Sequence, residues 1–162
     1  MIDFLKDKVK YLKEPYRLRV HIGYILIITF ALTAQPSFNR LMIGTAGIFL
    51  AVIIRAWASG IVMKNEELAV EGPYSLCRNP LYVGNILIGY SFTVIHGSLW
   101  SVGLLTLYLL LFYPYTIKRE ANRMHDLFGE EYEEYSDEVP VLIPRLTPYT
   151  TLSGWSFEQY FF

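Results

Sequence analysis

The sequence contains 162 residues, of which 53% are hydrophobic, 16% are aromatic and only 18% are charged, with a formal net charge of −1. A soluble domain is usually about a quarter charged, so this composition favours an integral membrane protein over a soluble one. The single cysteine, Cys77, excludes an internal disulfide. Because no repeat or low-complexity linker interrupts the chain, we expect one domain over residues 1–162.

Residues 1–19 carry six basic side chains with apolar residues between them. This pattern predicts a basic amphipathic segment that lies on an anionic membrane surface; an ordinary solvated helix is the alternative. The segment is too polar to be a secretory signal peptide, and we expect none. The basic residues are Lys6, Lys8, Lys10, Lys13, Arg17 and Arg19.

Long apolar stretches predict four membrane-spanning helices. Residues 20–34 form the first candidate, and extending it past Pro36 brings it to the ~20 residues that a span needs. Residues 41–63 form the second candidate. Residues 81–117 contain no Asp, Glu, Lys or Arg, and their length suits two spans joined by a hairpin at His96-Gly97-Ser98.

Arg55 is the one charged residue inside the second predicted span, near its middle. A charge at membrane depth is costly and by default marks a functional position. We therefore expect Arg55 to hold an anionic group of the substrate. The alternative is that Arg55 snorkels to the interface or pairs with a loop carboxylate such as Glu71.

From Lys118 the sequence becomes charged and predicts a helix that leaves the membrane and ends at Pro140 and Pro144. Basic residues gather in the N-terminal segment, in the loop at 64–78 and after residue 117. By the positive-inside rule, both ends of the chain and this loop lie in the cytoplasm. The predicted fold is an all-α, multi-pass membrane bundle in which residues 20–117 span the membrane and residues 118–162 form a cytosolic segment.

The stretch VEGPYSLCRNPLYVGN at residues 70–85 combines turn-forming and polar residues beside an apolar run. Gly72-Pro73-Tyr74 predicts a turn. Asn79-Pro80 predicts the start of a helix, with Asn79 as its N-cap, because proline suits the first helical turn and disfavours helix before it. This start brings Arg78, Tyr82 and Asn85 together at one helix end.

Three motifs in order carry a family resemblance: RAWASG at 55–60, GPYSLCRNPLYVGN at 72–85, and EAxxMxxxFGxxYxxY at 120–135, the last followed by VPxxIP. The combination resembles the integral-membrane methyltransferases of the isoprenylcysteine carboxyl methyltransferase type and, more distantly, the phospholipid methyltransferases. The resemblance implies a helical membrane enzyme that uses S-adenosylmethionine and a lipophilic or lipidated methyl acceptor among membrane lipids. It also implies that the segment at residues 118–162 covers the cofactor. We expect no metal and no nucleic-acid partner.

The resemblance and the chemistry of the side chains together nominate a site. Backbone N–H groups of Leu81 and Tyr82, with Arg78, suit the cofactor carboxylate. Glu120 suits its ammonium or ribose hydroxyls, and tyrosine rings suit its sulfonium. The predicted catalytic residues are Arg55, Arg78 and Glu120. The predicted cofactor-binding residues are Tyr74, Arg78, Asn79, Pro80, Leu81, Tyr82, Gly84, Asn85, Glu120, Tyr132 and Tyr135.

Two positions depart from the family pattern. Asn79 replaces the usual histidine and cannot act as an acid or base near neutral pH, and Ala121 replaces the second of two paired glutamates. Methylation of a carboxylate needs no base, since alignment and desolvation suffice. The pattern therefore favours carboxyl O-methylation of an isoprenylcysteine-like acceptor, which we expect to enter from the bilayer between the second and fourth spans.

Other functions remain as alternatives. One is N-methylation of a phospholipid. A sterol-type reductase that binds NADPH has a similar C-terminal pattern, and a non-catalytic membrane adaptor would have lost cofactor binding. Titration with the two cofactors separates these classes.

Overall fold

The computed structural model describes residues 15–61 and 67–150, and within these ranges all regular secondary structure is helical. This confirms the all-α prediction. Five α-helices and one short 3-10 helix make up the described part: α2 (Pro15–Thr33), α3 (Phe38–Ser59), η1 (Gly72–Ser75), α4 (Pro80–His96), α5 (Leu99–Phe128) and α6 (Glu130–Glu138).

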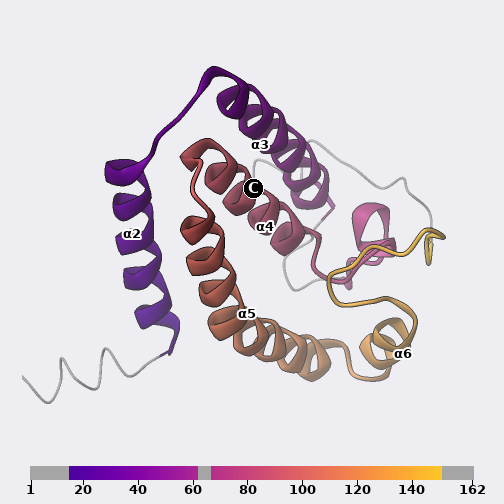
Figure 1. The fold of residues 1–162 in the computed structure, drawn as a ribbon. Coiled ribbons are helices and arrows are strands. Elements are labelled where there is room, and N and C mark those ends of the chain that lie inside the picture. The colour runs from indigo at the N-terminus through magenta and orange to yellow at the C-terminus, as the bar shows by residue number, and fades with distance from the viewer. Residues whose placement is uncertain (1–14, 62–66, 151–162) are drawn as a thin grey trace, which may run out of the picture.

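The four long helices lie side by side, with α4 between α3 and α5 and with α2 on the other side of α5 (Figure 1). The two short connections meet at one end of this bundle, where the Gln35 N–H donates to the His96 carbonyl at 3.0 Å. At the same end, Thr33 Oγ1 lies 3.1 Å from His96 Nε2. The start of α4 therefore lies at the opposite end of the bundle, together with the end of α3.

Glycines allow α3 and α4 to pack closely, as small residues do between membrane helices. A Cβ added to Gly44 would lie 2.3 Å from Ile95 Cγ1, and one added to Gly47 would lie 2.3 Å from Ser91 Oγ. At the other end of the contact, a Cβ on Gly84 would lie 2.4 Å from Arg55 Cγ. The backbones of these two helices are therefore in near contact along their length.

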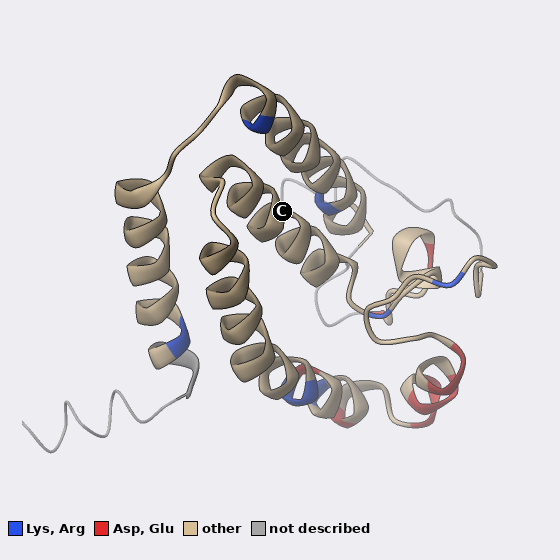
Figure 2. Cartoon of the chain, viewed as in Figure 1, with Lys and Arg blue, Asp and Glu red and all other residues tan. Residues whose placement is uncertain are grey.

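Two of the described helices, α3 and α5, are long and apolar enough to cross a membrane. The apolar part of α2, Leu18–Thr33, is shorter, and α4 has 17 residues. Large apolar side chains point outward, including Phe49, which is 69% exposed. Charged residues concentrate around α6, the loops and the C-terminal half of α5, whereas α4 carries none (Figure 2). This arrangement supports a membrane protein; a count of four spans remains a prediction.

The first two helices have different bounds from those expected. The first does not continue past Pro36: α2 ends at Thr33 and gains its length at the other end, from Pro15. Residues before a proline disfavour helical geometry, which accounts for the earlier end. The second helix ends at Ser59, so Arg55 lies in its last turns and not near its middle. Of the predicted basic segment, residues 1–14 lie outside the described residues.

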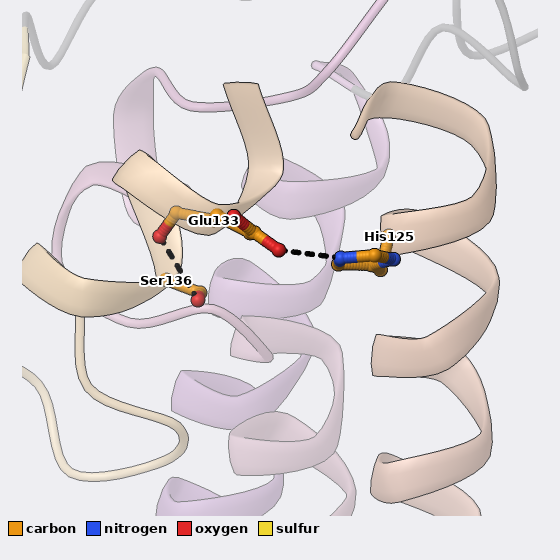
Figure 3. Close-up of polar contacts among 3 residues, drawn as sticks. All are labelled: His125, Glu133 and Ser136. Carbon is orange, nitrogen blue, oxygen red and sulfur yellow. Dashed lines mark hydrogen bonds and ion pairs between the residues drawn. The ribbon is translucent and has the colours of Figure 1, made fainter. Parts of the chain in front are cut away.

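The hairpin and the C-terminal helix follow the prediction more closely. Gly97 separates α4 from α5 and has a φ of 85°, a conformation that glycine adopts readily. The helix through Lys118 is a direct continuation of α5, and Gly129, with a φ of 53°, turns the chain into α6. A contact of 2.6 Å between His125 Nε2 and Glu133 Oε1 bridges this corner (Figure 3). α6 ends before Pro140, as expected.

Candidate functional site

Residues 70–79, which carry the first part of the second motif and precede α4, form a segment that we call the motif loop. The segment that follows α6 holds this loop in place. The N–H of Arg78 donates to the Pro140 carbonyl at 2.8 Å, and the N–H of Arg145 donates to the Leu76 carbonyl at 2.9 Å. Further along, the Tyr149 N–H donates to the Ser75 carbonyl at 2.9 Å. The residues after α6 therefore run alongside the loop; the rest of the predicted aromatic tail, 151–162, lies outside the described residues.

The start of α4 agrees with the predicted helix start. Pro80 is its first residue and Asn79 occupies the N-cap position, but the Asn79 side chain makes no capping hydrogen bond. Its Nδ2 instead donates to the Val141 carbonyl at 3.1 Å. The Tyr82 N–H donates to the Asn79 carbonyl at 3.0 Å, so it is not the free anion donor that we expected from the sequence.

Polar side chains from three helices meet on the first two turns of α4. The Tyr82 hydroxyl donates to Glu120 Oε1 at 2.8 Å, which joins α4 to α5. Arg55 Nη1 donates to Asn85 Oδ1 and, at 3.4 Å, to the Leu81 carbonyl, which joins α3 to α4. These contacts, and not a pair with Glu71, account for the polar end of Arg55.

Arg78 carries an unsatisfied donor. Its Nε is buried and has no hydrogen-bond partner among the described residues. A buried donor without a partner costs about 1–3 kcal/mol, so an anionic ligand at this position would gain a charge-assisted hydrogen bond. Among the predicted cofactor contacts that the structure describes, Arg78 is the one whose side chain has a buried donor without a partner.

The other predicted tyrosines are buried around the motif loop. Tyr135 lies on α6, where it packs with Tyr132 and Val139, and its hydroxyl donates to the Tyr74 carbonyl at 2.8 Å. Burial, then the nearby charges of Cys77 and Glu120, raises the pKa of the Tyr74 hydroxyl far above its usual value. Tyr132 and Tyr135 therefore mainly support the loop, through the buried cluster on α6 and the hydrogen bond to the Tyr74 carbonyl.

The cluster around α6 also gives a physical reason for Ala121. Ala121 packs against the buried group of Tyr132, Tyr135 and Val139. A carboxylate there would lose solvation among apolar side chains. The side chain of the neighbouring Glu120 bonds to Tyr82 instead. Of the two glutamates in the family pattern, this chain therefore keeps the one that reaches the polar cluster.

Arg19, Thr116 and Tyr113 belong to this cluster and were not predicted. Arg19 Nη1 donates to Thr116 Oγ1 at 2.8 Å, and Thr116 lies on α5 one turn before Glu120. The Tyr113 ring lies 5.1 Å from the Tyr82 ring in an edge-on arrangement. The sequence had assigned Arg19 to a surface segment, and nothing in the local pattern connects it with residues almost a hundred positions away.

No group of three or more His, Cys, Asp or Glu side chains that could hold a metal ion occurs in the ranges that the structure covers. The polar cluster at the start of α4 is built from arginine, tyrosine, asparagine, threonine and one glutamate. Such a set suits a ligand with an anionic group and hydroxyls or an ammonium.

Comparisons with known proteins give two relatives that match most of this chain. The chain is 36% identical over 118 residues to the cobalt-zinc-cadmium resistance protein CzcN of Cupriavidus metallidurans, which covers 72% of this chain and 54% of that protein. It is 31% identical over 117 residues to the nickel-cobalt-cadmium resistance protein NccN of Alcaligenes xylosoxydans xylosoxydans, covering 71% of this chain and 54% of that protein. The chain therefore spans about half the length of these two relatives.

A third relative carries an enzyme name. The chain is 32% identical over 83 residues to the protein-S-isoprenylcysteine O-methyltransferase of Schizosaccharomyces pombe, covering 51% of this chain and 35% of that protein. No solved structure matches the chain. The phospholipid methyltransferase family matches residues 18–131, a range that includes the first two motifs and most of the third. On this match, the chain belongs to the phospholipid methyltransferase family.

Proposed function

We propose that this protein transfers a methyl group from S-adenosylmethionine to a lipophilic acceptor at the cytosolic face of a membrane. The observation that carries the proposal is the meeting of the three motifs at the start of α4. Arg55 from the first motif, Tyr82 from the second and Glu120 from the third all belong to one polar cluster. Family membership supports the same reaction class.

The residues present fit the proposed cofactor. The unsatisfied Nε of Arg78 is a donor for a carboxylate. Glu120, oriented by the Tyr82 hydroxyl, has acceptor capacity left for an ammonium or a ribose hydroxyl. When bound, S-adenosylmethionine supplies an electrophilic methyl group on its sulfonium. The tyrosines near Glu120 offer ring faces that attract such a cation.

Arg55 would hold the acceptor. Its guanidinium is oriented by Asn85 and by the Leu81 carbonyl, within the first two turns of α4. A planar guanidinium binds a carboxylate or phosphate in a defined orientation. Holding an acceptor anion there, beside the residues that hold the cofactor, lowers the barrier through alignment and exclusion of water.

We favour a carboxylate acceptor, as in carboxyl O-methylation of an isoprenylcysteine-like substrate. The side chain of Asn79 cannot take a proton, and it is engaged with the Val141 carbonyl. Methylation of a carboxylate requires no proton removal. The name of the Schizosaccharomyces pombe relative supports this acceptor class.

N-methylation of a phospholipid is the second candidate, favoured by the description of the matched family. An ammonium acceptor must lose a proton before it can be methylated. This candidate therefore predicts a rate that rises with pH toward the pKa of the amine, whereas a carboxylate acceptor gives no such rise.

The proposal includes four membrane spans with the polar cluster in the cytoplasm. Its support is the distribution of lysine and arginine, together with the meeting of the two short connections at the other end of the bundle. Neither connection contains a lysine or an arginine, and Arg40 lies nearby in the first turn of α3.

The test uses purified full-length protein in detergent. Calorimetric titration with S-adenosylmethionine and with NADPH identifies the cofactor, and we expect binding of the first only. The protein is then incubated with radiolabelled S-adenosylmethionine and a membrane lipid extract, and the labelled product is identified by mass spectrometry. Binding of NADPH alone would favour the reductase, and binding of neither cofactor would favour the adaptor.

A further inference from the structure

An apolar groove with a volume of about 390 Å³ lies between α4, α5 and residues 141 and 142. Ile86 and Tyr90 contribute the α4 wall, and Leu109 and Tyr113 lie on the α5 wall. None of the described residues that line it is charged. The volume falls within the range of about 300–1,000 Å³ that is usual for small-molecule sites, and the lining suits a hydrocarbon.

The shape of α5 accounts for the groove. Pro114 lies inside this helix and lines the groove. A proline in a helix interior removes one backbone hydrogen bond and bends the helix. Figure 1 shows α5 bending near its middle, so that its C-terminal half runs toward α6. Before the bend the helices are close, since a Cβ on Gly89 would lie 3.0 Å from Leu105 Cδ2. The groove therefore opens where the two helices diverge.

Two side chains that line the groove, one from α4 and one from α5, form a hydrogen bond with each other. The hydroxyls of Tyr90 and Thr106, which both line the groove, are 2.9 Å apart. The Thr106 hydroxyl also donates to the Val102 carbonyl at 2.8 Å. Because these hydroxyls are satisfied within the protein, a hydrocarbon can lie against them without leaving a buried polar group unpaired.

The groove is continuous with the polar cluster. Tyr113 lines the groove, and its ring contacts that of Tyr82, whose hydroxyl is bonded to Glu120. On the loop side, Val141 lines the groove and accepts a hydrogen bond from Asn79. One end of the apolar groove thus adjoins residues of two of the three motifs.

We propose that this groove binds the single hydrocarbon chain of the methyl acceptor and that the chain enters sideways from the bilayer between α4 and α5. The inference rests on the methyl-transfer function proposed above. Leu110 lines the groove and is 68% exposed, which leaves a side of the groove open to the outside of the bundle. This position differs from the entrance between the second and fourth spans that the sequence suggested, because α4 lies between those two helices (Figure 1).

Binding in the groove makes affinity depend on chain length, since each buried methylene contributes about fourfold in affinity. Tryptophan substitutions test the location directly. Leu109→Trp and Ile86→Trp each fill the groove from a different helix. Leu107→Trp is the matched control, because Leu107 is on α5, is 53% exposed and does not line the groove.

The full-length protein is placed in phosphatidylcholine vesicles with an N-acetyl-S-farnesylcysteine probe that carries a diazirine on its farnesyl chain. After photolysis, cross-linked residues are mapped by mass spectrometry. We expect labels on groove residues, a decrease of about tenfold or more in each groove variant, and no change in Leu107→Trp. Calorimetric titration of every variant with S-adenosylmethionine establishes that it is folded.

Labels that spread over the outward face of α3 would overturn the inference. Labelling of groove residues that is as strong in both groove variants as in the wild-type protein would overturn it too. Competition gives a further test. If excess phosphatidylcholine removes the groove labelling as effectively as unlabelled N-acetyl-S-farnesylcysteine does, the groove binds bystander lipid and the inference is overturned. A wild-type protein that binds no S-adenosylmethionine overturns the proposed function instead, whatever the labelling pattern.

Discussion

The Tyr82 hydroxyl donates a hydrogen bond to Glu120 Oε1 at 2.8 Å and so links the first turn of α4 to the C-terminal half of α5. The two residues are 38 positions apart in the sequence. The bond orients the Glu120 carboxylate. Because α5 bends and Ala121 packs against the buried cluster on α6, Glu120 is the acidic residue of the polar cluster. Several measurable properties depend on this arrangement.

Cofactor affinity should depend on Glu120 and Arg78. We expect Glu120→Ala and Arg78→Ala each to weaken S-adenosylmethionine binding roughly 30-fold, since loss of a charge-assisted hydrogen bond costs about 2 kcal/mol. Calorimetric titration measures the change. Glu130→Ala is the control, because Glu130 is exposed at the start of α6. If Glu130→Ala weakens binding while Glu120→Ala does not, the third motif has been assigned to the wrong carboxylate.

Turnover should depend on the shape of Arg55 as well as on its charge. Arg55→Lys keeps the charge but loses the planar fork that bonds to Asn85 and the Leu81 carbonyl. We expect kcat to fall about tenfold, the equivalent of about 1.4 kcal/mol, while cofactor affinity changes little. Single-turnover rates and titration separate the two effects. Unchanged turnover in this variant would leave Arg55 with a structural role only.

The close packing of α3 and α4 predicts opposite effects for two glycine substitutions. Gly84→Ala places a Cβ 2.4 Å from Arg55 Cγ, and such overpacking typically costs about 1–3 kcal/mol. Gly103, in α5, has no atom within 4 Å of an added Cβ, so Gly103→Ala should stabilise its helix by about 0.5–1 kcal/mol. Thermal unfolding in detergent measures both. Equal melting temperatures would show that α3 and α4 do not pack as described.

The reactivity of Cys77 should depend on pH in a direction set by burial. Cys77 is 2% exposed, and burial raises the pKa of its thiol although a hydrogen bond from the Asn79 backbone partly lowers it. Iodoacetamide should therefore alkylate native Cys77 at least about tenfold more slowly at pH 8 than a cysteine placed at Ser98 in a Cys77→Ser background.

The raised pKa of the Cys77 thiol also affects the free energy of unfolding. Because the folded state holds the thiol proton of Cys77 more tightly, this residue contributes fully to the free energy of unfolding below the pKa of the unfolded thiol, about 8.5. It is then lost as the pH rises toward the higher pKa of the folded state. Unfolding measured from pH 8 upward should show a decline that is smaller in Cys77→Ser. An identical decline in both proteins would contradict the buried environment of this thiol.

The orientation in the membrane is tested by labelling single cysteines with an impermeant maleimide in the Cys77→Ser background. We expect Gln35→Cys and Ser98→Cys to react from outside the cell, and Glu130→Cys to react only after the membrane is opened. Lys64→Cys, which lies outside the described residues, should behave like Glu130→Cys. Reaction of Lys64→Cys from outside would separate the motif loop from the segment after α5 and end the proposal of a shared site.

The sequence by itself determined much of the local structure. Pro80 after Asn79 predicted where α4 begins, and His96-Gly97-Ser98 predicted the turn before α5; both agree with the structure. These features are local, because proline restricts its own and the preceding residue and glycine tolerates a positive φ. The order of the three motifs was likewise enough to indicate the family.

Only the tertiary structure decided which polar groups meet. Asn79 occupies the N-cap position, yet its amide bonds to Val141, and Arg19, which the sequence placed in a surface segment, donates from α2 to Thr116 of the polar cluster. Likewise, the groove depends on the bend of α5 and on the position of α4 between its neighbours. A side chain's partner is set by distances between helices that pack face to face, and these distances arise from packing along whole helices, which no local pattern of residues specifies.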